Sequence, residues 1–170
     1  MKKLTILVFA ITLLTFDMAN AESGGLWAST DVYGGRNRIN NINIATKAIN
    51  GVIIRPGQEF SYNKVVGERN EENGFKEADS FLKGETVKTI GGGICQVSST
   101  LFMEIKKFSK IVITEHHKHS REVKYGKNGA DATVSWGTKD FKFKNELGYP
   151  IKIIAKVSEG RISVRLIKAD

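Results

Sequence analysis

The sequence predicts an α+β fold: an antiparallel sheet with a few helices, one of which carries a candidate nucleophile and packs on the sheet. Apolar residues recur at helical spacing in two segments, residues 39–49 and 97–108. After the second segment the period changes to two, so that apolar and polar residues alternate as in half-buried strands. We therefore expect a mainly antiparallel C-terminal half that is covered by the second helix.

The N-terminus has the pattern of a secretory signal peptide. Lys2 and Lys3 precede an apolar run over residues 4–16, and Ala19-Asn20-Ala21 is a small-x-small cleavage motif. The run is shorter than the roughly 20 apolar residues that span a bilayer. We expect residues 1–21 to be removed, which would leave an exported protein of the cell envelope (periplasm, wall or extracellular) with no stable membrane span.

Charge and length limit the remaining possibilities. The 170-residue chain has 26 Lys and Arg against 18 Asp and Glu, a net charge of +8. Residues 22–35 are polar and glycine-containing, which predicts a flexible lead-in, and residues 36–170 suffice for one domain with a core. A basic exported domain suits an anionic wall polymer such as peptidoglycan or teichoic acid. Export argues against nucleic acid as a partner, and simple solubility also explains the charge.

The first half of the domain has one clear helical pattern. It ends at Asn50-Gly51 and consists of Ile39, Ile42, Ala45 and Ile49. Residues 52–54 follow as a predicted strand, with a turn at residues 55–57. Residues 59–66 are expected to be extended, and residues 75–82 to form a weak helix within a polar, glycine-rich stretch.

The second half contains the stronger helix and the strands. The helix has one apolar stripe, formed by Val97, Leu101, Ile105 and Phe108. Alternation with polar residues predicts strands at residues 111–114, 132–136, 141–143 and 162–166, the last after a turn at Glu159-Gly160.

Cys95 is the single cysteine of the chain, so a disulfide within the chain is impossible. It stands where Gly91, Gly92 and Gly93 lead into the second helix. A helix N-terminus lowers the pKa of a thiol, and glycines let a substrate approach the backbone closely. The N–H groups of Cys95 and Gln96 could then face an oxyanion. The alternative is a small buried residue at a helix start, with glycines that serve only a tight turn.

All three histidines lie in the segment from Glu115 to Ser120. On an extended segment His117 and His119 would share one face, and His116 would point to the other. A thiol nucleophile needs an imidazole partner, which a third polar group often orients. The candidates for this third group are Asp131, Asn145 and Glu115. His-x-His is also a zinc-ligand spacing, and a solvated histidine run is the plainest alternative.

These segments together resemble the VanW family of exported proteins. The resemblance covers roughly residues 36–154 and is most specific in the block Gly91-Gly92-Gly93-Ile94-Cys95-Gln96 with His-x-His-Ser downstream. Further matches are Arg55-Pro56-Gly57, Phe60-Ser61-Tyr62-Asn63, Gly74-Phe75, Tyr125, Asp131-Ala132-Thr133-Val134, Asp140 and Asn145. The chain departs from the family at His116, where arginine is usual, and at residues 126–128, where a proline-containing loop is common.

The resemblance implies work on the cell wall, since some family members are understood to be cysteine L,D-transpeptidases of peptidoglycan stem peptides. It implies Cys95 as nucleophile, His119 as base, His117 as second imidazole or orienter, and Asp131 as a further orienter. The backbone from Gly93 to Gln96 would form the oxyanion site, and no cofactor or metal would be needed. A non-catalytic wall-binding module and a zinc-dependent peptidoglycan hydrolase remain the alternatives.

Overall fold

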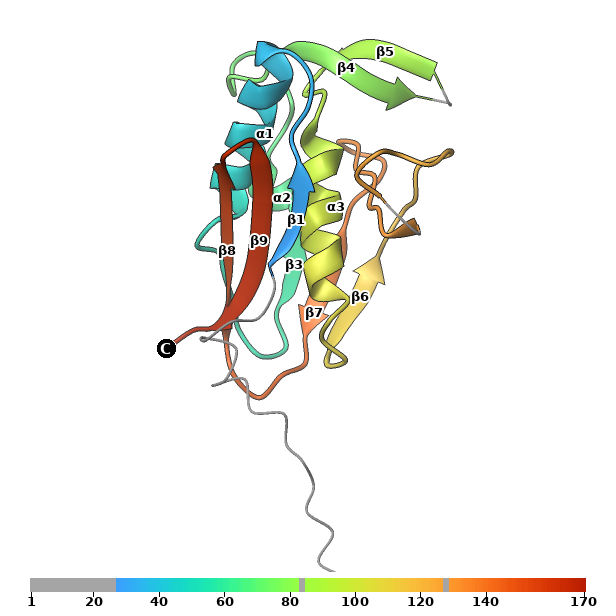
Figure 1. Ribbon diagram of the computed structural model, residues 1–170. Coiled ribbons are helices and arrows are strands. Elements are labelled where there is room, and N and C mark those ends of the chain that lie inside the picture. The colour runs from blue at the N-terminus through green and yellow to red at the C-terminus, as the bar shows by residue number, and fades with distance from the viewer. Residues whose placement is uncertain (1–26, 83–84, 127–128) are drawn as a thin grey trace, which may run out of the picture.

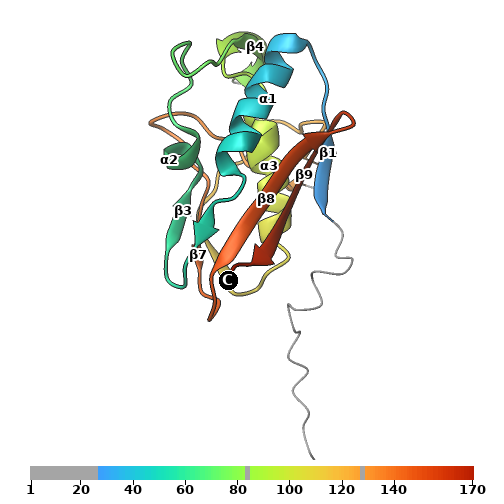
Figure 2. The same ribbon diagram turned by 90° about the vertical axis from the view of Figure 1, so that its left-hand side faces the viewer.

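The computed structural model describes residues 27–82, 85–126 and 129–170. Antiparallel sheets and a few helices make up this part of the chain (Figures 1 and 2). The α+β class predicted from the sequence is therefore confirmed. The predicted signal peptide, residues 1–21, lies outside the described residues, as do residues 127 and 128 of the loop that departs from the family pattern.

The strands of the described residues pair only in antiparallel fashion. A four-stranded sheet has the order β1-β9-β8-β2 and consists of β1 (Ala28–Asp31), β9 (Arg161–Lys168), β8 (Ile151–Ser158) and β2 (Ile53–Ile54). A three-stranded sheet has the order β3-β7-β6, from β3 (Glu59–Ser61), β7 (Lys142–Asn145) and β6 (Ile111–Glu115). Strands β4 (Glu77–Leu82) and β5 (Glu85–Ile90) pair with each other at one end of the molecule (Figure 1).

Helix α1 (Arg36–Ile49) confirms the first helical pattern. Ile42, Ala45 and Ile49 are fully buried, because these positions lie on the face that packs against β8. Ile39 lies at the edge of this stripe and stays 38% exposed. The helix therefore anchors the four-stranded sheet, with its N-terminus near the β4–β5 pair (Figure 2).

Helix α3 (Ile94–Ile105) confirms the second helical pattern and is the central element of the fold. It packs against β9, β1 and α1, and Figure 1 shows it between the two larger sheets. Val97, Leu101 and Ile105 are buried as predicted, whereas Phe108 lies beyond the end of the helix and packs against the core from the following turn. The helix contains Cys95 and contacts β9 and β1 of the four-stranded sheet.

Four predictions about local structure outside the two helices are wrong. Residues 28–31, assigned to a flexible lead-in, form β1 because they pair with β9. Residues 75–82, expected to be helical, contribute β4, which pairs with β5 over its whole length. Residues 59–66 are extended only to Ser61 and then form the short helix α2 (Tyr62–Val66), with the Ser61 side chain as its N-cap. Residues 132–136 make only one isolated bridge instead of a strand, although Ala132 and Val134 are buried as their alternation suggests.

The remaining strands of the C-terminal half were predicted with mixed accuracy. Strands β6 and β9 match the alternating segments 111–114 and 162–166, and β7 covers most of the segment 141–143. Strand β8 was not predicted, although it pairs with β9 along eight residues. Within the described residues, no helix is long and apolar enough to cross a membrane.

Candidate functional site

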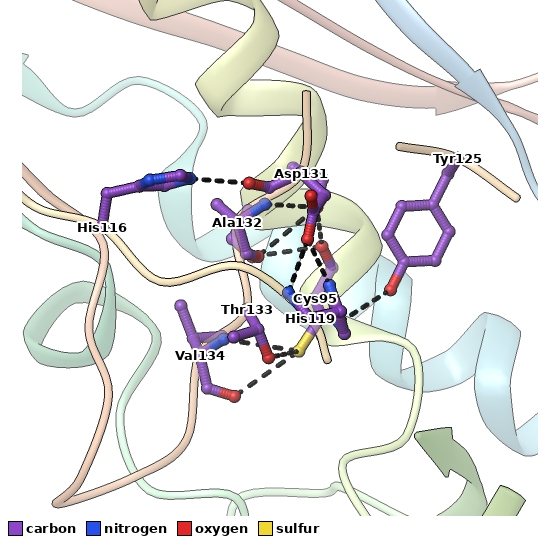
Figure 3. A network of polar contacts seen from close by, with 10 residues as sticks. Cys95, His116, His119, Tyr125, Asp131, Ala132, Thr133 and Val134 are labelled. Atoms are coloured by element: carbon purple, nitrogen blue, oxygen red, sulfur yellow. Dashed lines mark hydrogen bonds and ion pairs between the residues drawn. The ribbon is translucent and has the colours of Figure 1, made fainter. Parts of the chain in front are cut away.

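Cys95 occupies the second position of α3 and is only partly covered. Its sulfur accepts the backbone N–H of Val134 at 3.5 Å and lies 3.4 Å from the Val134 carbonyl oxygen. The Thr133 hydroxyl is 3.7 Å away (Figure 3). The thiol therefore sits between the start of the helix and the segment that follows Asp131.

That segment is held against α3 by two buried serines. The Ser99 hydroxyl accepts the Ala132 N–H at 2.9 Å, and the Ser98 hydroxyl donates to the Ala132 carbonyl at 2.6 Å. Both serines are fully buried. Their hydroxyls thus fix the backbone between Asp131 and Thr133, which explains a polar face on an otherwise apolar helix.

The glycine triplet before Cys95 serves the protein's own packing. A Cβ at Gly92 would lie 2.4 Å from the Ala78 carbonyl oxygen of β4, and Gly93 adopts a φ of 109° that favours glycine. A Cβ at Gly91 would lie 2.8 Å from the Arg69 side chain. The three glycines therefore allow β4, Arg69 and the start of α3 to approach one another closely.

The predicted oxyanion site does not fit this geometry in full. The N–H groups of Gly91, Gly92 and Gln96 each donate to a backbone carbonyl of the protein, at 3.0 to 3.2 Å. The Gln96 side chain is fully buried, donates to Asp31 and accepts from Arg38. These groups have internal partners, so Gln96 is a structural residue here and cannot offer its N–H to an oxyanion as arranged.

His119 and Asp131 form the closest ionisable pair of the site. The imidazole Nδ1 lies 2.6 Å from the Asp131 Oδ2, which also accepts the His119 backbone N–H at 2.8 Å. Both side chains are less than 10% exposed. The other ring nitrogen, Nε2, is 3.4 Å from the Tyr125 hydroxyl and lies on the side of the Cys95 sulfur (Figure 3). Asp131 therefore orients an imidazole that is directed at the thiol.

The pKa values of Cys95 and His119 shift in opposite directions. Burial raises the pKa of the Cys95 thiol, but the hydrogen bond with His119 and the Val134 N–H outweigh it and leave this pKa below its ordinary value. Burial lowers the pKa of His119, and the interactions with Cys95 and then Asp131 outweigh it and leave this pKa raised. Both shifts act in the direction of a thiolate beside an imidazolium.

The other two histidines do not follow the predicted strand alternation. Strand β6 ends at Glu115 with a register shift, so the following residues do not alternate between two faces. The His117 ring accordingly pairs with Glu115, with its Nε2 3.0 Å from the Glu115 Oε1. His116 instead shares Asp131 with His119, since its Nε2 lies 2.7 Å from the Asp131 backbone carbonyl oxygen. The shared face predicted for His117 and His119 is wrong, because the two rings pair with different carboxylates, Glu115 and Asp131.

Several residues around the thiol were missed as site residues by sequence reasoning. Tyr125 contacts His119, and Val134 contacts the sulfur through its backbone. The Arg69 side chain lies against Gly91, in the glycine triplet that leads to Cys95. Tyr125 lay in the family match, but a backbone contact such as that of Val134 has no signal in the sequence. Arg69 stands in a polar loop whose composition predicts nothing specific.

A cavity of about 430 Å³ opens beside Tyr125. Its wall includes Tyr33, Tyr125, Lys124 and Arg161. The rings of the two tyrosines stack with their centres 6.3 Å apart. Cys95 and His119 do not line it, so it adjoins the histidine side of the site only through Tyr125.

The fold and the site define a small α+β domain with a cysteine, a histidine and an aspartate arranged in series at the start of a buried helix. Residues 37–167 match the sequence model of the family described as VanW like protein, and the chain belongs to this family. The predicted family resemblance is therefore confirmed.

Two curated relatives support this assignment. The chain is 42% identical over 135 residues to the uncharacterized protein YoaR of Bacillus subtilis (strain 168), which covers 79% of this chain and 44% of that protein. It is 28% identical over 134 residues to the vancomycin B-type resistance protein VanW of Enterococcus faecalis (strain ATCC 700802 / V583). This match covers 74% of this chain and 47% of that protein. The chain thus spans less than half the length of these relatives. No solved structure matches it.

Proposed function

We propose that this protein is an exported, cysteine-dependent acyl transferase of the L,D-transpeptidase type that acts on peptidoglycan stem peptides. The observation that carries the proposal is the series Cys95, His119, Asp131, in which the carboxylate orients the imidazole and the imidazole faces the thiol. A nucleophile, a base and an orienting group in this order are the requirements of covalent acyl transfer.

In the first half-reaction the Cys95 thiolate attacks the carbonyl carbon of the third residue of a donor stem. The tetrahedral intermediate collapses, the C–N bond to the terminal D-alanine breaks, and the leaving amine takes the proton of the His119 imidazolium. In the second half-reaction the side-chain amine of a neighbouring stem attacks the thioester and gives a proton to His119. The C–S bond breaks, and the thiolate–imidazolium pair is restored. Water in place of the amine would give hydrolysis.

A cell-wall substrate is supported by charge and by a relative. The net charge of +8 favours an anionic polymer. One relative is named a vancomycin B-type resistance protein, a name that agrees with a role connected with the cell wall. The N-terminal signal pattern supports a place in the cell envelope.

The acylation step can be tested directly. The protein is incubated with a tetrapeptide muropeptide, and its intact mass is measured. We expect the wild type to gain the acyl mass and Cys95→Ala to gain none. Equal labelling of both would contradict the proposal, and Ser98 and Ser99 would not replace the thiol, because both hydroxyls are buried in bonds to Ala132. If neither protein is labelled and Cys95→Ala keeps its cellular function, the non-catalytic wall-binding module is favoured.

The zinc-hydrolase alternative required His117 and His119 to act on one ion. They point to different carboxylates, Glu115 and Asp131. Among residues 27–82, 85–126 and 129–170, no group of three or more His, Cys, Asp or Glu side chains is arranged to hold a metal ion. This arrangement favours the thiol reaction over the zinc reaction.

Export is tested separately from the chemistry. We propose cleavage after Ala21, so N-terminal sequencing of the protein recovered from the cell envelope should begin at Glu22. A protein that retains Met1 at its N-terminus, or that is found only inside the cell, would contradict the export proposal and leave the chemistry of Cys95 to the acylation experiment.

A further inference from the structure

Arg69 is held in a fixed position beside the glycine triplet that leads to Cys95. Its guanidinium donates to the Gly67 carbonyl and to the Asn63 Oδ1, each at 2.7 Å. Asn63 in turn donates to the carbonyls of Ser135 and Lys139, on either side of the turn that carries Trp136. The guanidinium is thus oriented by a hydrogen-bonded frame rather than free to rotate.

Two aromatic rings flank this guanidinium. The Arg69 Cζ lies 5.8 Å from the ring centre of Tyr62 and 5.8 Å from that of Trp136. The Tyr62 ring is fully buried, and its hydroxyl donates to the Ile94 carbonyl, next to Cys95. Trp136 is 47% exposed, the highest value among the large apolar side chains left exposed in the described residues. The buried Tyr62 ring therefore contacts both Arg69 and the backbone next to Cys95, whereas the Trp136 ring lies between Arg69 and solvent.

The charge of Arg69 has no counter-ion among the ion pairs of the described residues. The nearby Asp140 carboxylate is already committed to the Ser61 hydroxyl and to the backbone N–H groups of Asn63 and Phe141. The Nε of Arg69 is buried and has no hydrogen-bond partner. A guanidinium has five N–H donors, and two of them are used here. Unpaired donors on a half-buried guanidinium cost folding free energy, and a bound anion that accepts hydrogen bonds from them would offset this cost.

We infer that Arg69 and Trp136 form a subsite for the free carboxylate of the donor peptide's terminal residue, one residue beyond the bond that is cleaved. A guanidinium recognises a carboxylate through paired, charge-assisted hydrogen bonds. The leaving residue is attached to the carbonyl that Cys95 attacks, so its carboxylate reaches only a group close to the thiol. Arg69 meets this requirement, because its side chain lies against Gly91 and beside the Tyr62 ring, whose hydroxyl bonds to the Ile94 carbonyl. Trp136 covers the apolar part of the same residue. The inference rests on the proposed function and specifies its donor: a peptide with a free C-terminal carboxylate.

Binding to the Cys95→Ala variant of the full chain tests the subsite without chemistry. Two ligands are compared, a tetrapeptide stem with a free C-terminal carboxylate and the same peptide as its C-terminal amide. The probe is the NMR signal of the Trp136 indole N–H, assigned with Trp136→Phe. We expect the carboxylate peptide to bind about 10- to 100-fold more tightly than the amide, as a charge-assisted hydrogen-bond pair would give.

Arg69→Gln in the same background should remove this ratio by weakening only the carboxylate peptide, and Arg69→Lys should keep part of it. Arg55→Gln, at an exposed arginine, is the matched control and should retain the ratio. Thermal denaturation shows whether each variant is folded. If Arg69→Gln does not fold, the affinity ratio measured with Arg69→Lys tests the inference. Equal affinities for both peptides, a ratio that survives in the folded Arg69 variants, or no binding at all would overturn the inference. A peptide that binds Cys95→Ala but never acylates the wild type would instead overturn the proposed function.

Discussion

The Nδ1 of His119 lies 2.6 Å from the Oδ2 of Asp131, and the backbone N–H of the same histidine donates to the same oxygen at 2.8 Å. One carboxylate oxygen thus fixes both the ring and the main chain of His119. The ring can then present only Nε2 to the Cys95 side of the site (Figure 3). This relationship makes the site sensitive to the charge of residue 131.

Asp131→Asn should therefore reduce acylation of Cys95 by about 10²-fold or more, because the amide can still accept a hydrogen bond but no longer stabilises an imidazolium. Single-turnover acylation followed by intact mass measures the effect. Thermal denaturation is the control, since the side chain is buried. A folded variant with unchanged acylation would show that Asp131 has only a structural role.

Alkylation of Cys95 should depend on pH in a way that reports the ion pair. The pKa of Cys95 is lowered and that of His119 is raised, so each group stabilises the charged form of the other. As pH falls through the Cys95 pKa the thiolate is protonated and alkylation slows. His119→Gln removes the hydrogen bond and the positive charge, so the midpoint should move to higher pH and the rate at pH 7 should fall about tenfold or more. Iodoacetamide kinetics measure both, and coincident pH profiles would contradict the pair.

The three histidines should separate by function and by stability. His119→Ala should lose about 10²–10⁴-fold in turnover, whereas His117→Ala should lose little, because this side chain is 37% exposed and pairs with Glu115. His116→Ala should cost about 1–2 kcal/mol of unfolding free energy, since its ring stacks on Phe102 at 4.2 Å and bonds to the Asp131 carbonyl. Turnover and thermal denaturation of the three variants distinguish these effects. A large turnover loss in folded His117→Ala would restore that residue to the site.

Gly92→Ala should destabilise the protein by about 1–3 kcal/mol, because its Cβ would meet the backbone of Ala78 at 2.4 Å. Gly35→Ala is the matched control: this glycine also precedes a helix, but nothing lies within 4 Å of its Cβ and its φ is −76°. Urea denaturation of both variants gives the comparison. Equal midpoints would mean that β4 moves aside without cost.

Glu115 should make the stability depend on acid pH. Hydrogen bonds from Lys142, the Asp140 N–H and His117 lower its pKa to about 2. A lowered carboxyl pKa stabilises the folded state above the unfolded value, and this contribution is lost as pH falls toward about 2. Glu115→Gln should therefore be less stable than wild type at pH 7, by about 1 kcal/mol, and the difference should shrink on acidification. A difference that does not change with pH would assign the effect to packing.

The helices and the position of the thiol could be predicted from the sequence for a local reason. The period of apolar residues reports which face of a segment is buried, and α1 and α3 each bury the face that their spacing indicates. The position of Cys95 at the start of α3 could be predicted in the same way, because the glycine triplet marks where this helix begins. Alternation likewise located β6 and β9, and in β9 buried side chains alternate with more exposed ones as the sequence pattern indicates.

Long-range pairing decided the rest, and no local pattern reports it. Residues 77–82 form a strand only because β5 lies beside them, and residues 132–134 run along α3 only because Ser98 and Ser99 bind Ala132. After the register shift at the end of β6, the His117 ring pairs with Glu115 and the His119 ring pairs with Asp131. The sequence by itself determined the fold class, the family and the candidate thiol. Only the tertiary structure decided which imidazole and which guanidinium lie beside that thiol, because those neighbours come from segments that hydrogen bonds across the chain bring together.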